Sequence, residues 1–221
     1  MNFHGTAFPF GGSMLLTAFH VAANAEASGN RVLIGWPPPR PNKPFEFMNA
    51  SVVQTWPHVD MAAIMVPGTM FPPLSWNASQ LPLLTQVRAY GFPHGYEPRA
   101  LYHRAFAGPI VGHRTTYKFS GQPEVYELQF AAPLGLSGAA LLTGDLEVAG
   151  CVVGNATSML ARHGSTEAVS EPIRCTKDDD WDLLHLGIAI CASEILQLRF
   201  DGGSTIHDIA ATKLGLRILN D

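Results

Sequence analysis

Proline and glycine are spread along the whole of this chain and divide it into short segments. The 221 residues include 17 prolines and 21 glycines, and both residue types interrupt long helices and mark the turns between short strands. Hydrophobic residues make up 47% of the sequence and charged residues 14%, which is typical of a folded protein with a large core. The sequence therefore predicts an all-β barrel or sandwich, and its length suits a single unit of that class.

The segments expected to form strands are short and mostly apolar. They are residues 14–17, 31–36, 51–56, 61–66, 87–93, 105–112, 125–130, 139–142, 147–153 and 186–190. Gly144 and Asp145 indicate a turn that joins two of these strands into a hairpin. Helical spacing occurs near the C-terminus, at residues 193–199 and in the tail that follows. Loops are expected at residues 36–44, 71–85 and 156–182.

Charge and cysteine content exclude several classes of protein. The net charge is −4 and no basic cluster is present, which argues against a nucleic-acid-binding surface. No apolar run is long enough to span a membrane, and the apolar residues 14–19 are not preceded by the Lys or Arg of a secretion signal. Cys151, Cys175 and Cys191 are odd in number and irregularly spaced, which indicates reduced thiols rather than a zinc site or disulfides. We expect a cytoplasmic protein with no metal, cofactor, nucleic-acid or membrane partner.

Three short motifs carry residues that could perform chemistry. His20 follows an apolar segment, Asp60 immediately precedes another, and Ser137 lies between glycines. A serine on a glycine-rich turn lets backbone amides approach a substrate, and a buried carboxylate needs a hydrogen-bond donor such as a histidine. Each motif alone is also compatible with a purely structural role: a packed histidine, a solvent-facing aspartate and a small-residue turn.

The order of these motifs resembles that of the trypsin-like serine peptidases of the chymotrypsin fold, in which histidine, aspartate and serine follow one another along the chain. The three matching stretches are Thr17-Ala18-Phe19-His20-Val21, Asp60-Met61-Ala62-Ala63-Ile64 and Gly135-Leu136-Ser137-Gly138. Segments 89–93, 144–153 and 187–198 are similar to bacterial HtrA-like members, and no PDZ-like extension follows them. The resemblance covers roughly residues 5–198.

The resemblance implies a fold of two packed, six-stranded, antiparallel β-barrels followed by a C-terminal helix. The peptidase domain would comprise residues 1–200, with barrel halves of about 1–80 and 81–200, and residues 201–221 would form a tail or short helix. Leu136 departs from the family pattern, because secreted digestive members carry an aspartate there that pairs with a freed N-terminus. Activation by N-terminal cleavage is therefore not expected.

By the same resemblance, His20 is the general base, Asp60 orients it, and Ser137 is the nucleophile. The backbone amides of Gly135 and Ser137 would form the oxyanion hole. Two further groups would bind an extended protein or peptide substrate. They are the edge strand Val153, Gly154 and Asn155, and the uncharged pocket residues Ala131 and Ala189, which suit a small or medium apolar side chain. An activating or regulatory protein partner is compatible with such an enzyme.

Two other functions remain open at the level of sequence. The first is a catalytically silent trypsin-like module that uses the barrel for binding. The second is an esterase of the α/β-hydrolase class, because Gly135-x-Ser137-x-Ala139 approaches a nucleophile elbow and His207 follows it in the chain. An elbow requires a strand-to-helix turn in an alternating βα chain, whereas the residues after Ser137 predict a β-hairpin.

Overall fold

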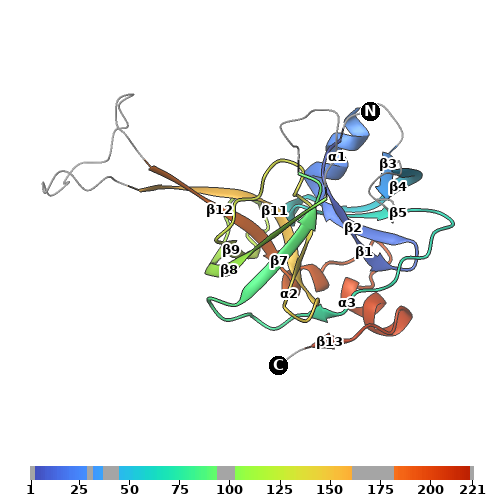
Figure 1. The fold of residues 1–221 in the computed structure, drawn as a ribbon. Helices are drawn as coiled ribbons and strands as arrows, with labels where there is room; N and C mark the ends of the chain where they lie inside the picture. Colours follow the sequence, from blue (N-terminus) through green and yellow to red (C-terminus); the bar gives the residue numbers. More distant parts are fainter. Residues whose placement is uncertain (1–2, 29–31, 37–44, 94–102, 161–181, 220–221) are drawn as a thin grey trace, which may run out of the picture.

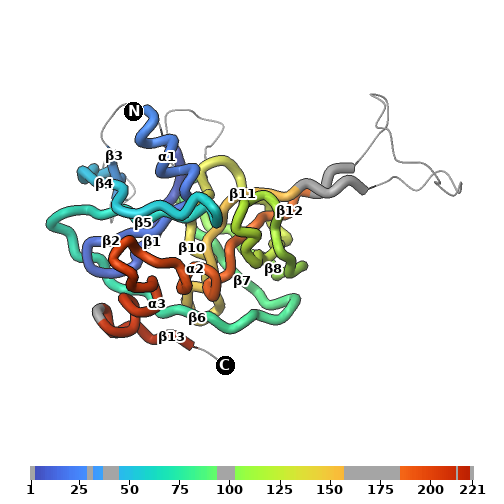
Figure 2. The backbone as a smooth tube through the Cα atoms, turned by 180° about the vertical axis from the view of Figure 1, so that it is seen from behind, coloured from blue at the N-terminus to red at the C-terminus, as the bar shows by residue number. Residues whose placement is uncertain are grey.

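The computed structural model describes residues 3–28, 32–36, 45–93, 103–160 and 182–219. They form two packed β-sheets, of five and eight strands, with short helices at their margins (Figure 1). The fold is chymotrypsin-like and mostly β, which confirms the predicted class. Seen from behind, the chain passes from the first sheet into the second and ends beside the first strand of the second sheet (Figure 2).

The N-terminal sheet has the strand order β1-β2-β5-β4-β3, and its neighbours are all antiparallel. Its strands are β1 (Ala7–Gly11), β2 (Met14–Ala18), β3 (Val32–Trp36), β4 (Glu46–Trp56) and β5 (Met61–Met65). The sheet curls into a half-barrel of five strands, which is the first of the two barrels of the chymotrypsin-like fold. β1 was not expected, because a proline and a glycine interrupt its short apolar pattern.

The second sheet contains a closed barrel. Six strands follow the order β10-β7-β8-β9-β12-β11, and a β10–β11 hairpin closes the ring, while β6 and β13 extend the sheet through parallel pairs. The eight strands are β6 (Trp76–Asn77), β7 (Gln86–Gly91), β8 (Arg104–Thr115), β9 (Glu124–Leu128), β10 (Ala140–Leu142), β11 (Val148–Leu160), β12 (Asp182–Cys191) and β13 (Ile218–Leu219). The hairpin expected around Gly144 is confirmed.

The strands β11 and β12 are longer than the sequence predicts. They pair antiparallel as far as Leu160 and Asp182, so a ribbon projects from the barrel where a loop over 156–182 was expected (Figure 1). Its polar composition concealed the strands, because a two-stranded ribbon away from the core needs few apolar residues. Residues 161–181 of this loop lie outside the described part of the chain, and so do residues 37–44 of the loop expected at 36–44.

The expectation that helix occurs only near the C-terminus was wrong. Helix α1 (Phe19–Ala27) follows β2 directly and buries Val21 and Ala22. Its four alanines favour a helix, but the segment is too short for helical periodicity to be read with certainty. The C-terminal helix α2 (Ala192–Leu196) is confirmed, and α3 (Ile206–Asp208) and a helical turn over Ile209–Lys213 follow it. No helix among the described residues is long and apolar enough to cross a membrane.

Three side chains that can lose a proton, Tyr126, Cys151 and Cys191, are buried in the hydrophobic interior. Burial raises the pKa of Tyr126 and of Cys191 to about 12 and raises the pKa of Cys151 above its usual range. Above about pH 9 an unfolded chain would lose these protons while the folded chain kept them. We therefore expect the free energy of unfolding to fall as the pH rises from about 9 to 12.

Denaturant titrations across this pH range test the expectation, with Cys191→Ala as the comparison. The variant should show a shallower loss of stability with pH, because one of the three groups no longer titrates. Equal slopes for the two proteins would contradict the assigned role of Cys191.

Candidate active site

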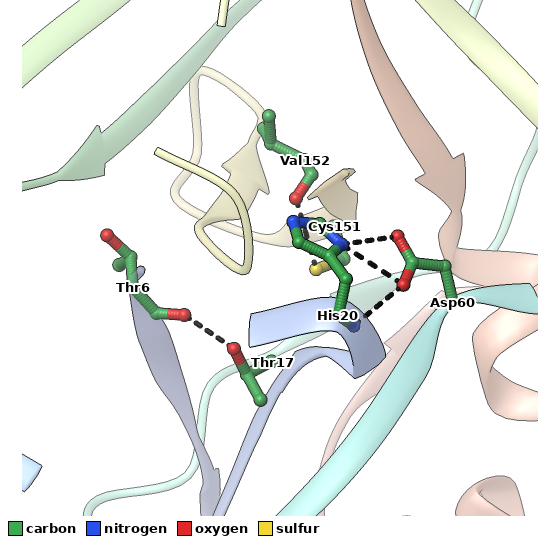
Figure 3. A network of polar contacts seen from close by, with 6 residues as sticks. All are labelled: Thr6, Thr17, His20, Asp60, Cys151 and Val152. Carbon is green, nitrogen blue, oxygen red and sulfur yellow. Dashed lines mark hydrogen bonds and ion pairs between the residues drawn. The ribbon is translucent and has the colours of Figure 1, made fainter. Parts of the chain in front are cut away.

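The structure brings the imidazole of His20 within hydrogen-bonding distance of the buried carboxylate of Asp60. His20 is the second residue of α1, and Asp60 lies between the short helical turn Pro57–Val59 and β5. The His20 Nδ1 atom lies 2.8 Å from Oδ2 and 3.1 Å from Oδ1 of Asp60 (Figure 3). Asp60 is 3% exposed, whereas the His20 side chain is 42% exposed. The aspartate therefore holds the Nδ1 edge of the ring, and Nε2 has no partner among the described residues.

Asp60 also fixes the first turn of α1. Its carboxylate accepts a hydrogen bond from the backbone N–H of His20 at 3.0 Å, and its backbone carbonyl accepts one from Phe19 at 2.9 Å. These two N–H groups would otherwise be unsatisfied at the start of the helix. Asp60 adopts a left-handed conformation with φ 56°, which aspartate tolerates better than most residues. The backbone and the side chain of one residue thus set the position of the imidazole.

Ser137 lies on a compact loop whose shape depends on two glycines. Leu136 N–H donates to the Pro133 carbonyl at 3.0 Å, and Gly135 has φ 94°, the combination expected of a type II turn. Gly138 has φ 87°, and its N–H donates a hydrogen bond to the backbone carbonyl of Val152 in β11 at 2.7 Å. Glycine is the residue that populates these conformations freely.

The loop is held against the N-terminal sheet beside α1. A Cβ atom on Gly138 would overlap the carbonyl oxygen of Thr6 and the hydroxyl of Thr17, and it would lie 3.1 Å from the backbone nitrogen of Ala18. Ala18 is two residues before His20. The tertiary packing therefore brings the serine loop next to the residues that lead into α1.

Two backbone N–H groups of this loop differ from those of Leu136 and Gly138, because they make no hydrogen bond among the described residues. Within the described residues, the N–H groups of Gly135 and Ser137 and the Ser137 hydroxyl make no hydrogen bond. In particular, His20 makes a hydrogen bond with Asp60 but none with the Ser137 hydroxyl. Such hydrogen bonds are often long in ligand-free proteins and tighten when substrate binds. Two backbone N–H groups and one hydroxyl on this loop therefore have no hydrogen-bond partner among the described residues.

Leu136 shows why this loop needs no charged anchor. Its side chain is fully buried in the core of the second barrel, and its Cδ1 atom packs 2.9 Å from the place that a Cβ on Gly91 would occupy. An apolar contact therefore holds the residue before Ser137.

The residues predicted to bind substrate differ in their placement. Val153 and Ala189 are buried, so neither presents an open side-chain surface, whereas Ala131 and Asn155 are exposed and Gly154 is partly so. The Asn155 side chain reaches the segment that precedes Ser137. There its Oδ1 accepts a hydrogen bond from the N–H of Ala132 at 2.6 Å, and its Nδ2 donates one to the carbonyl of Ala132 at 2.7 Å. Sequence reasoning missed this bridge, because nothing local marks Ala132 as its partner.

Among the described residues, no group of three or more His, Cys, Asp and Glu side chains could hold a metal ion.

The fold and the paired His20 and Asp60 define a chymotrypsin-like architecture. The sequence profile of the trypsin-like peptidase domain matches residues 5–154. Since this is more than half of the chain, the chain belongs to the trypsin-like peptidase family. Comparison with curated proteins gives no significant match.

Solved protease structures share this fold. The active form of the Rv3671c protease from M. tuberculosis is 23% identical, with a TM-score of 0.59 over 86% of this chain and 70% of that one. The HtrA-type protease AlgW with a decapeptide is 18% identical, with a TM-score of 0.58 over 85% and 48%. The MamO protease domain from Magnetospirillum magneticum is 12% identical, with a TM-score of 0.56 over 85% and 84%. At these identities the likeness establishes the fold alone.

Proposed function

We propose that this chain is a serine endopeptidase that hydrolyses peptide bonds in extended segments of protein substrates. The observation that carries the proposal is the buried Asp60 holding Nδ1 of a half-exposed His20, beside a loop that presents Ser137 and two free amides. The family membership and the fold shared with proteases support it.

The proposed reaction follows from these positions. Ser137 Oγ attacks the carbonyl carbon of the scissile bond while His20 Nε2 takes the hydroxyl proton. Negative charge develops on the carbonyl oxygen, where the N–H groups of Gly135 and Ser137 would stabilise it. The imidazolium then gives its proton to the leaving amine, and an acyl group remains on Ser137. Water, deprotonated by His20, releases that acyl group in the second half of the reaction.

A fluorophosphonate probe tests the proposal, because it forms a bond with an activated serine. The purified chain is incubated with the probe, and the modified peptide is identified by mass spectrometry. We expect a single adduct on Ser137, together with cleavage of an unfolded protein such as casein. Absence of both, including in the presence of peptides, would instead support a silent binding module.

The structure excludes the α/β-hydrolase interpretation. Ser137 leads into strand β10 of an antiparallel hairpin and not into a helix. His207 lies in α3 and lines a separate pocket of about 280 Å³. Ser137 is not among the residues that line this pocket: Ala78, Ser193, Leu196, Gln197, Thr205 and His207.

We further propose that the enzyme prefers a small side chain before the scissile bond. The expected pocket lies between the segment that approaches Ser137 and the 153–155 part of β11. The Asn155 amide joins these two walls through its paired hydrogen bonds to Ala132. We infer that this bridge limits the depth of the pocket. AlgW, an HtrA-type protease that shares this fold, has been solved with a decapeptide.

Replacing Asn155 with alanine should therefore broaden specificity. We compare kcat/KM for substrates with leucine before the scissile bond to kcat/KM for substrates with alanine there. We expect this ratio to rise about tenfold, which is the effect of one or two methylene groups in a pocket. Peptide series that differ only at that residue measure the ratio. Asn77→Ala is the matched control, because its amide donates to Glu147 in another part of the barrel. An unchanged ratio in Asn155→Ala would overturn the assigned role of the bridge.

A further inference from the structure

Thr6 connects the serine loop to both β-sheets. Its backbone N–H donates to the carbonyl of Ser137 at 2.9 Å, and its hydroxyl donates to the carbonyl of Gly135 at 2.7 Å. The same hydroxyl accepts from the N–H of Phe92 at 3.3 Å, after β7. The carbonyl of Thr6 accepts from the hydroxyl of Thr17 in β2 at 2.6 Å (Figure 3). Every polar group of this residue is therefore paired.

The surroundings of Thr6 are shaped to hold it in one position. Thr6 is 7% exposed. A Cβ atom on Gly91 would come within 2.8 Å of its hydroxyl oxygen, and one on Gly138 would overlap its carbonyl oxygen. Two glycines thus allow the close approach of three segments that are far apart in the sequence. The hydroxyl lies in a buried site, where unpaired polar groups are costly.

Thr6 binds the carbonyls of Gly135 and Ser137, the two residues that the proposed function assigns to the oxyanion hole. The N–H groups of both residues make no hydrogen bond among the described residues. Thr6 holds both through their carbonyl oxygens, one by its N–H and one by its hydroxyl. The spacing of the two residues is therefore set from outside the loop. Preorganised donors stabilise developing charge because they need no rearrangement during the reaction.

We propose that the Thr6 hydroxyl is a positioning group for the oxyanion hole, an inference that rests on the proposed peptidase function. The hydroxyl does not touch the substrate. It keeps the Gly135–Leu136 peptide in place, and because this peptide lies between the N–H groups of Gly135 and Ser137, it fixes their relative positions. Its loss should weaken transition-state stabilisation more than substrate binding.

The test compares Thr6→Val, which removes the hydroxyl, with Thr6→Ser, which keeps it. For Thr6→Val we expect kcat and the affinity for a peptide boronate to fall about 10- to 100-fold, at or somewhat below the cost of losing an oxyanion donor. KM should change little. Thr6→Ser should remain near the wild-type values. Thr143→Val is the matched control, because Thr143 is equally buried and accepts from Glu147 N–H in the β10–β11 turn.

Two further measurements separate a local effect from unfolding or from failure of the proposed function. Rates are divided by the concentration of folded protein, measured by circular dichroism below the unfolding temperature. Amide hydrogen exchange over residues 133–139 should quicken in Thr6→Val and not in Thr143→Val. An active wild type with an unimpaired Thr6→Val, or with Thr6→Ser equally impaired, overturns the role of Thr6 alone. A wild type inert towards the fluorophosphonate overturns the proposed function itself.

Discussion

Ser137→Ala is expected to abolish covalent labelling by a fluorophosphonate and to lower kcat about 10⁶-fold, the cost of losing the nucleophile of a serine-protease triad. The acyl intermediate cannot form without Oγ, and the remaining donors offer only weak catalysis. The stability of the fold should change little, because the hydroxyl makes no hydrogen bond within the described residues. Labelling, peptide cleavage and thermal unfolding measure these three effects.

Ser193→Ala provides the control for this experiment. Ser193 lies in α2 and lines the separate pocket beside His207, so its variant should keep both labelling and cleavage. Peptide cleavage that survives in Ser137→Ala, at more than a trace from contaminating proteases, would show that another residue is the nucleophile.

Asp60→Asn is expected to lower kcat about 10⁴-fold, as the same exchange does in a serine-protease triad. In the proposed mechanism, the carboxylate accepts the Nδ1 proton of His20 and leaves Nε2 free to accept the serine proton. An amide can instead donate to Nδ1, which moves the imidazole proton to Nε2 and blocks the base. The fold should survive, because an amide oxygen can still accept from the backbone N–H of His20.

Asp145→Asn is the control for that exchange, since Asp145 lies exposed in the β10–β11 turn. Its kcat should equal that of the wild type. If Asp60→Asn kept more than a tenth of the wild-type kcat, Asp60 would have a structural role in holding α1 and no essential role in catalysis.

Most strands could be predicted because their signal is local. Apolar runs between proline and glycine turns mark β2, β3, β5 and the β10–β11 hairpin, and burial of one face accounts for their composition. The helix α1 could not be predicted in this way. Nine residues are too few for a helical period to stand out, and the helix depends on capping by Asp60, which is distant in the sequence.

The candidate site, too, could be predicted only in part from the sequence. The residue types of His20, Asp60 and Ser137, and their order, could be recognised because each lies in a short motif. Their geometry could not be, because a hydrogen bond between residues 20 and 60 depends on how β2, α1 and β5 pack. Thr6 and the Asn155–Ala132 bridge carried no local signal, since their partners lie 129 and 23 residues away.

The sequence alone thus determined a β-rich fold, the family, and the three residues proposed for catalysis. These follow from local composition and motif order, which act over a few residues. Only the tertiary structure decided three features. The first sheet is a curled half-barrel, Asp60 makes a hydrogen bond with His20, and Thr6 donates hydrogen bonds to the carbonyls of Gly135 and Ser137. The physical reason is that hydrogen bonds and close glycine contacts between distant segments form only once both sheets have packed.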